Sequence, residues 1–161
     1  MEARRASCPY ALQKNKSSME KLFFAQKAFI VKNRQLLIIK KSDRARFCAG
    51  MWEVPGGRME PNESVEQHLS REVWEEVGIA VHAIEPFYVW DWTLRMDDDL
   101  THHIVGVAMY CDPQSDSVSI SNQVLDDDIA CYKWVDFADL KNYDFIPNMI
   151  PVIHAFLRKY A

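Results

Sequence analysis

The sequence predicts an α+β protein built as an α/β/α sandwich, with one mixed β-sheet between two helices. Two observations predict this architecture. Apolar residues recur with helical spacing over residues 63–77 and again over residues 147–160. β-rich segments flank the first of these helices on both sides along the chain. Since each amphipathic helix must bury one face, and a sheet offers two, we expect one helix on each face of the sheet.

Length and composition indicate one domain. The 161 residues suffice for a single sizeable core, and the content of 48% hydrophobic and 26% charged residues is ordinary for a soluble globular protein. Residues 1–20 contain few periodic apolar positions, so we expect a flexible leader there and the folded domain over residues 21–161. The net charge of −4 argues against duplex nucleic acid as a partner, because a duplex binder needs a basic surface.

No apolar run approaches the roughly 18 residues of a membrane span, and none reads as a signal peptide. The four cysteines form no CxxC pair, so we expect reduced thiols rather than disulfides. These features together predict a cytoplasmic protein that does not associate with membranes.

The first two strands are expected over residues 22–31 and 35–40, joined in a hairpin by residues 32–34. The basic segment that follows, residues 41–47, is interpreted either as a solvated loop or as a contact for phosphate groups. We favour the second interpretation, with Arg44 and Arg46 as the candidates, because a guanidinium fork matches phosphate oxygens.

A glycine turn and a helix come next. Gly56 and Gly57 allow backbone conformations that are closed to other residues, and Asn62 suits a left-handed position before the helix. Along the helix, every fourth position is apolar and is expected to face the core: Val65, Leu69, Val73 and Val77.

An adjoining stripe of the same helix carries Glu72, Glu75 and Glu76, at positions i, i+3 and i+4. Three carboxylates this close repel one another, which predicts a cation among them unless the stripe is simply solvated. Oxygen ligands without Cys or His at metal spacing favour Mg²⁺, with Mn²⁺ as the alternative. Arg71 is expected to orient the carboxylates by reaching Glu75 and Glu63.

The remaining elements complete the sheet and the second helix. We expect strands over residues 81–92, 102–112 and 132–137, the middle one buried on both faces, and a loop over residues 113–122. One aromatic side chain of the segment 87–92 is expected either to pack in the core or to stack on a nucleobase. The helix over residues 147–160 has Pro151 in its first turn and Arg158 and Lys159 near its end.

The central stretch resembles a known motif. The pattern Gly57-x5-Glu63-x7-Arg71-Glu72-Val73-x-Glu75-Glu76-x-Gly78-Ile79 looks like the complete Nudix box, and residues 50–56 resemble the segment just upstream of it in MutT-like members. The resemblance extends from about residue 20 to the end of the chain. Two positions depart from the usual pattern. Asn62 replaces a glycine, and His68 stands where a small residue is usual, either as a packing residue or as a side chain that alters the site's shape or pH response.

This resemblance implies a Mg²⁺-dependent hydrolase that cuts a diphosphate linkage in a nucleoside diphosphate attached to another group; a nucleoside triphosphate would give a monophosphate and pyrophosphate. By position, Glu72, Glu75, Glu76 and the Gly56 carbonyl would be metal ligands, and Glu72 also a possible general base. Asp128, with Asp127 second, would add a ligand or base, unless that acidic turn is only solvated. Asn148 would contact a base or cap the last helix.

Several alternatives remain open. Within enzymes, the chain also resembles in part the coenzyme A pyrophosphatases, and ADP-ribose or nucleotide sugars are possible substrates. An isopentenyl diphosphate isomerase is disfavoured by the short chain and the complete box. A nucleotide-sensing module without catalysis is disfavoured because it has no reason to keep all the carboxylates. We expect a small nucleotide as the partner and a monomer or homodimer as the assembly.

Overall fold

The computed structural model describes residues 20–95, 100–124 and 128–161. The strands are β1 (Glu20–Lys32), β2 (Gln35–Lys41), β3 (Trp52–Glu53), β4 (Val81–Arg95), β5 (Thr101–Pro113) and β6 (Ile129–Asp136), and the helices are α1 (Val65–Val77) and α2 (Ile150–Tyr160). Two 3₁₀ segments, Phe137–Asn142 and Pro147–Met149, precede α2.

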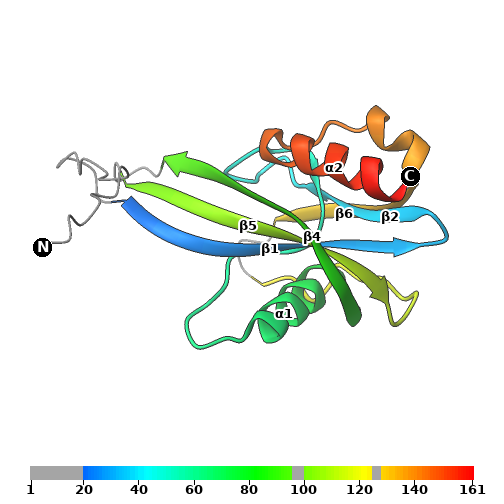
Figure 1. Ribbon diagram of the computed structural model, residues 1–161, viewed down its shortest axis with the longest axis horizontal. Coiled ribbons are helices and arrows are strands. Elements are labelled where there is room, and N and C mark those ends of the chain that lie inside the picture. The colour runs from blue at the N-terminus through cyan, green and yellow to red at the C-terminus, as the bar shows by residue number, and fades with distance from the viewer. Residues whose placement is uncertain (1–19, 96–99, 125–127) are drawn as a thin grey trace, which may run out of the picture.

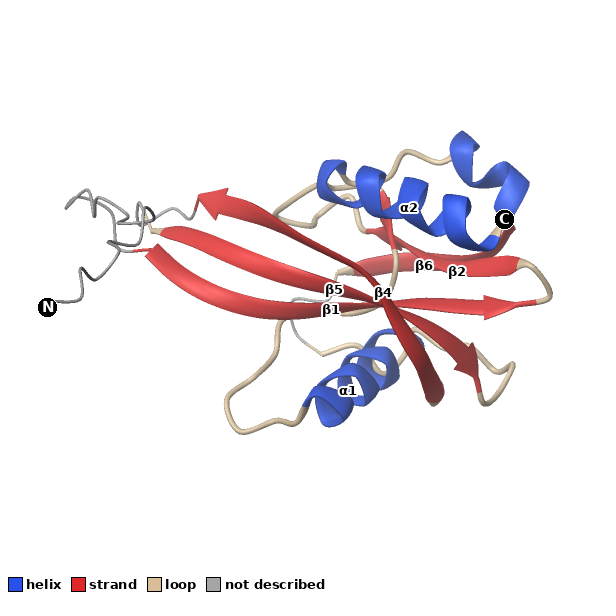
Figure 2. Cartoon of the chain, in the orientation of Figure 1, coloured by secondary structure: helices blue, strands red, loops and turns tan. Residues whose placement is uncertain are grey.

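The strands form one mixed sheet. β1 and β5 are parallel, while β4 pairs antiparallel with β5, and β2 pairs antiparallel with β1, β3 and β6. Helix α1 lies on one side of the strands and α2 on the other (Figure 1), so Figure 2 shows helix, sheet and helix as three layers. The predicted α/β/α sandwich with a mixed sheet is therefore confirmed.

Helix α1 begins after Ser64, whose side chain and Gln67 form a reciprocal capping box, and it ends at Gly78 in the left-handed conformation. Its apolar face packs Leu69, Val73 and Val77 into a core with residues of β1 and β2. The prediction for Val65 is wrong. Its side chain is 50% exposed, because it is the first helical residue and the buried stripe instead passes through His68 and Glu76.

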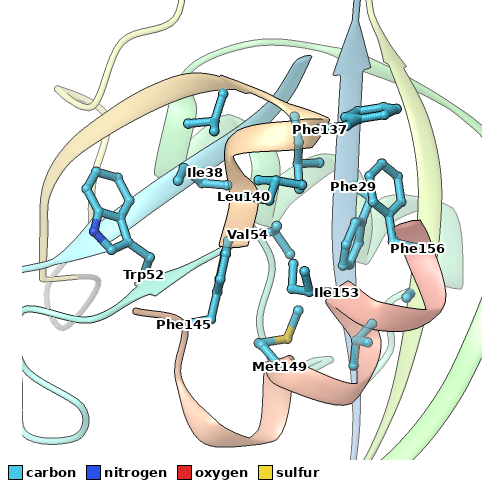
Figure 3. Close-up of a cluster of buried hydrophobic side chains, with 14 of the residues drawn as sticks. Phe29, Ile38, Trp52, Val54, Phe137, Leu140, Phe145, Met149, Ile153 and Phe156 are labelled. Carbon is cyan, nitrogen blue, oxygen red and sulfur yellow. The ribbon is translucent and has the colours of Figure 1, made fainter. Parts of the chain in front are cut away.

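The opposite core lies between the sheet and α2 (Figure 3). Phe156 of α2 contacts Phe29 of β1, with ring centroids 5.0 Å apart, and Phe137 at 4.9 Å. This core also takes in Trp52 and Val54, which lead directly into the glycine turn. The packing of α2 therefore fixes one end of the segment that carries Gly56 and Gly57.

The turn between β1 and β2 was predicted correctly, and the burial of β5 was not. The hairpin turn is confirmed, because β1 and β2 are joined through Asn33 and Arg34, both at positive φ. The burial predicted for both faces of β5 is wrong for one face. Alternate residues from His102 to Ala108 are buried, but the residues between them are partly exposed, because α1 makes its main contact with β1.

Cys48, Cys111 and Cys131 are free thiols, as expected, and Cys8 lies outside the described residues. Burial raises the pKa of the Cys111 thiol to about 12, so it stays protonated at neutral pH. Neither described helix has the length and apolar character needed to cross a membrane.

Candidate active site

The glycine turn runs beside β1 and is held to it by main-chain hydrogen bonds. Ala28 N donates to Pro55 O at 2.7 Å, and Gln26 N donates to Gly57 O at 3.1 Å. Gly56 has φ +123, and a Cβ there would collide with the Gln26 carbonyl. Only glycine fits this position, because the two main chains approach so closely.

Arg71 lies at the centre of the acidic stripe of α1. Its Nε and Nη2 donate to the two oxygens of Glu63, at 2.5 and 3.1 Å, and its Nη1 lies 3.0 Å from Glu75 Oε2 and 3.1 Å from Glu72 Oε1. The hydrogen bonds from Arg71 lower the pKa of Glu63 to about 2. The predicted contacts of Arg71 with Glu75 and Glu63 are confirmed. Its guanidinium also contacts Glu72, so one cation holds three carboxylates at fixed positions.

Glu76 is the most deeply placed of the three carboxylates. It is 7% exposed and accepts a hydrogen bond from Gly56 N at 2.6 Å. Burial raises the pKa of Glu76 to about 8, although the charge of Lys27 opposes the shift. Burial also raises the pKa of Glu72, against the charge of Arg71. Both carboxylates therefore gain from a further cation near them.

Lys27 and Glu53 form a buried ion pair that the sequence analysis missed. Lys27 Nζ donates to Glu53 Oε2 at 2.6 Å and also to the carbonyls of Val54 and Gly56, and Lys41 Nζ lies 3.3 Å from Glu53 Oε1. Burial lowers the pKa of Lys27, but the charges of Glu53 and Glu76 outweigh it, so the net shift is upward. The available signal was a lone lysine within the apolar run of β1.

His68 is fully buried beside Glu72. Its Nε2 lies 3.8 Å from Glu72 Oε1, beyond hydrogen-bond distance. Neither ring nitrogen makes a hydrogen bond of normal geometry within the described residues, although the Gly57 main chain acts on the ring and raises its pKa slightly against the effect of burial. Burial lowers the pKa of His68, so the ring is neutral at pH 7. The interpretation of His68 as a packing residue is supported by this complete burial.

A pocket of about 1020 Å³ opens over these groups. Glu72, Glu75, Glu76, Arg71, Lys27 and Glu53 line one part of it. Phe23, Phe47 and Trp92 line the same pocket, as do Arg58 and Asn148. Arg58 lies over the Phe23 ring at 4.9 Å. The acidic residues therefore share one pocket with aromatic surface, which is the arrangement needed for a phosphate chain joined to a flat base.

Asn148 reaches this pocket from the 3₁₀ segment before α2. The interpretation of Asn148 as a helix cap is wrong, because Met149 is the N-cap residue of α2 and no side chain caps the helix. The 3₁₀ turn continues directly into α2, so Asn148 sits within a helical turn and its side chain lies along the pocket.

The structure places Arg44 and Asp128 around a separate hollow. Arg44 and Asp128 line it together with Ser42, whose N–H donates to the Asp128 carbonyl at 2.6 Å. Arg46 lies over the ring of Phe47, 5.1 Å from its centroid, and Phe47 does line the large pocket. Val124 borders both spaces. Asp127 lies outside the described residues.

Comparison with known proteins agrees with this geometry. The NUDIX domain model matches residues 25–156, which is most of the chain. The chain belongs to the Nudix family. It is 32% identical to the nucleoside triphosphatase NudI of Klebsiella pneumoniae (strain 342) over 118 residues, which cover 68% of this chain and 77% of that protein. It is 38% identical to a MutT-like protein of Streptomyces ambofaciens over 79 residues, 49% of this chain and 44% of that protein.

Solved Nudix structures share the fold. The crystal structure of the MutT protein from Methanosarcina mazei Go1 aligns with a TM-score of 0.67 and 22% identity, over 89% of this chain and 97% of that one. The solution structure of the E. coli ORF135 protein aligns with a TM-score of 0.64 and 23% identity, over 88% and 92%. The protein is thus a MutT-like Nudix hydrolase, a pyrophosphohydrolase by family.

Nudix hydrolases generally depend on a divalent metal ion, and the donor set here suits one. Glu72, Glu75 and Glu76 supply hard oxygen ligands. The Glu72 carboxylate occupies the space that a Cβ on residue 57 would need, and Gly57 leaves that space free. Among the described residues, no three such side chains already converge on one point. Arg71 holds Glu72 and Glu75 in ion pairs, so a bound cation would compete with its guanidinium for these two carboxylates.

Proposed function

We propose that this Nudix hydrolase uses Mg²⁺, or Mn²⁺ in its place, to hydrolyse a nucleoside triphosphate to the monophosphate and pyrophosphate. The observation that carries the proposal is the shared pocket, in which three carboxylates of α1 face the same space as Trp92, Phe23 and Asn148. The similarity to a nucleoside triphosphatase supports the choice of substrate class. We place the reaction in the cytoplasm, with a monomer or homodimer as the working form.

The carboxylates and the Gly56 carbonyl would hold the metal ion. A bound divalent cation supplies charge for the phosphate oxygens and acidifies a water molecule. Arg71 keeps Glu72 and Glu75 at a fixed spacing, and Glu76 is anchored through the Gly56 N–H. Glu72 is the candidate base, since a pKa raised by burial brings a carboxylate nearer to the working pH.

The aromatic residues that line the pocket would bind the nucleoside. We assign the base to the aromatic wall of Phe23 and Trp92, where stacking is favourable for any base. Asn148 would hydrogen-bond to an edge of the base, because an amide both donates and accepts. Arg46, in the segment between β2 and β3, would meet the outer phosphates. Arg44 and Asp128 line the hollow on the far side of Val124, so they would contribute a cation and a carboxylate where the phosphate chain extends past Val124.

The reaction balances without a further reactant. The oxygen of water forms a bond to a phosphorus of the triphosphate, the bridging P–O bond breaks, and one proton is released. The products are the nucleoside monophosphate and pyrophosphate. Since such a reaction asks the protein mainly for positioning and positive charge, the ordered carboxylates and cations of this pocket are adequate for it.

The test is a hydrolysis panel with Mg²⁺ that contains normal and oxidised nucleoside triphosphates, ADP-ribose, nucleotide sugars, dinucleoside polyphosphates and coenzyme A. We expect triphosphates to give the highest kcat/KM and to release pyrophosphate. Glu75→Gln and Glu76→Gln should each lower kcat by about 100-fold or more while the far-UV spectrum is unchanged. Glu66→Gln, an acid of the first turn of the same helix, is the matched control and should keep the normal rate.

Three results would contradict the proposal. Preferential cleavage of coenzyme A or of ADP-ribose would show that nucleoside triphosphates are not the preferred substrates. Nucleotide binding without release of pyrophosphate or monophosphate would indicate the sensing module. Normal rates in both glutamine variants would remove the metal assignment.

A further inference from the structure

Lys27 is a lysine whose ammonium group lies inside the site rather than in solvent. Its side chain is 9% exposed, and it projects from the middle of β1. Its Nζ donates to Glu53 Oε2 at 2.6 Å, to the Val54 carbonyl at 3.3 Å and to the Gly56 carbonyl. An ammonium has three N–H groups, so each one has an acceptor here.

These acceptors are the oxygens that a hard cation prefers. One carboxylate and two main-chain carbonyls form a hard-oxygen donor set of the kind that divalent cations bind, with water completing the shell of a smaller ion such as Mg²⁺ or Mn²⁺. The carboxylates of Glu76 and Glu72 also interact favourably with the charge of Lys27. The ammonium group therefore lies where this donor set would otherwise bind a metal ion. The Gly56 carbonyl has two lone pairs, so it can accept from Lys27 and still be a ligand of the one ion that Glu72, Glu75 and Glu76 would hold.

The position of Glu53 leads to the same conclusion. Glu53 is 6% exposed, and Lys27 Nζ, at 2.6 Å from its Oε2, is its nearest cationic partner. Lys41 Nζ lies further away, 3.3 Å from Oε1. Without Lys27, this buried carboxylate would lose its nearest partner and gain from another cation in the same place.

We propose that Lys27 is a built-in cation of the site: its ammonium takes the place of one divalent ion, so the free enzyme binds a single Mg²⁺ or Mn²⁺. The inference rests on the proposed metal-dependent function. It also assigns Lys27 a positioning role, because the bond to the Gly56 carbonyl fixes the turn against which Glu76 is anchored.

The experiment counts Mn²⁺ bound to the metal-free, full-length protein without nucleotide, from the loss of the free-ion signal in electron paramagnetic resonance. The wild type should bind one Mn²⁺. Lys27→Met keeps the length of the side chain but removes its charge, and it should bind two, the second with a Kd below about 1 mM. Equal numbers in the two proteins would overturn the proposal.

Two further variants identify the new ion. Lys27→Met with Glu53→Gln should return to one Mn²⁺, because the carboxylate that would bind the second ion is gone. Lys32→Met removes the same charge at the exposed end of β1 and should stay at one. A second Mn²⁺ that persists in the double variant would also overturn the proposal, because the ion would not occupy the place of Lys27.

Folding of Lys27→Met is itself informative. If this variant unfolds in metal-free buffer, Mn²⁺ should restore its circular dichroism, and the added Glu53→Gln change should abolish that dependence. Failure of Mn²⁺ to restore the fold would show that a divalent ion does not replace the ammonium group. If the wild type binds no Mn²⁺ at all, the proposed metal dependence itself is wrong, whatever Lys27→Met does. Glu75→Gln tests that dependence separately, because this variant is expected to lose the single ion.

Discussion

The main chain of Gly57 lies directly against the carboxylate of Glu72. A Cβ on Gly57 would stand 2.6 Å from Glu72 Oε2 and 2.9 Å from its Cδ. Gly57 is not among the glycines with positive φ, so alanine can adopt its backbone conformation. The glycine is therefore required by the position of Glu72 and not by the turn itself.

Gly57→Ala should inactivate the enzyme without unfolding it. The methyl group displaces the Glu72 carboxylate, and a shift of about 1 Å in a catalytic group can lower the rate by about 100-fold. We expect kcat to fall by about that factor, with Tm within about 4 °C of the wild type. The measurements are steady-state kinetics on the best triphosphate and a thermal melt.

Gly50→Ala is the contrasting control. Gly50 has φ +73, and its Cβ would meet only Asp43 Oδ1, at 3.4 Å. Alanine there should cost about 1 kcal/mol of stability through backbone strain and leave kcat unchanged. A normal kcat in Gly57→Ala would show that Glu72 tolerates displacement.

Glu76 should make the metal-free enzyme less stable as the pH rises. Burial raises the pKa of Glu76 from 4.5 to about 8 in the folded chain, so the folded state binds more protons than the unfolded state between these values. Its contribution to the free energy of unfolding is thus complete below pH 4.5 and is lost as the pH rises to about 8. Urea unfolding in EDTA at pH 5 and at pH 8 measures this loss.

Glu76→Gln isolates the effect, because glutamine keeps the shape without the titration. The decrease in the free energy of unfolding from pH 5 to pH 8 should be smaller in the variant by about 1 kcal/mol or more. Mg²⁺ at pH 8 should stabilise the wild type more than Glu76→Gln. An identical pH dependence of the free energy of unfolding in the two proteins would contradict the raised pKa of Glu76.

Local sequence rules predicted much of this molecule. The helical period located α1 and α2, the acidic spacing located the contacts of Arg71, and Asn62 does adopt φ 71. These features depend on residues a few positions apart in the chain. Helix geometry and turn chemistry are sufficient to predict them, without knowledge of how the strands pair.

Contacts between distant segments were the part that could not be predicted. Lys27 and Glu53 are 26 positions apart, and only the course of residues 54–58 along β1 brings them together. From the sequence alone, a lysine in a strand is expected to be exposed to solvent.

The wrong prediction for Val65 has a similar cause, because burial depends on contacts that the sequence does not show. Its spacing fits the apolar stripe, but the buried positions of the helix include His68 and Glu76 instead.

His68→Leu should be neutral or stabilising. The buried imidazole of His68 makes no hydrogen bond of normal geometry among the described residues, where only the Gly57 main chain interacts with it as a hydrogen-bond partner, so removing it should recover a desolvation cost of roughly 1 to 3 kcal/mol. Leucine fills a similar volume, so we expect the free energy of unfolding to stay level or rise by about 1 kcal/mol. Urea unfolding at pH 8, where His68 is neutral, gives the value. A loss of more than about 2 kcal/mol would mean that the ring makes a bond that matters to the fold.

Arg71→Lys should show that Arg71 and Glu63 act as one unit. Lysine keeps the charge of Arg71 but cannot bond to both oxygens of Glu63 while it spaces Glu72 and Glu75, because it lacks the planar fork. We expect kcat/KM to fall by about 30-fold. Glu63→Gln should lower it by a similar factor, because the guanidinium of Arg71 is then no longer held in place by Glu63.

A double-mutant cycle on kcat/KM tests whether the two residues act together. Since both changes break the same contact, the double variant should lose little more than either single one. Arg158→Lys, in the last turn of α2, is the matched control and should have no effect. Additive losses in the double variant would mean that Arg71 and Glu63 act on the reaction separately.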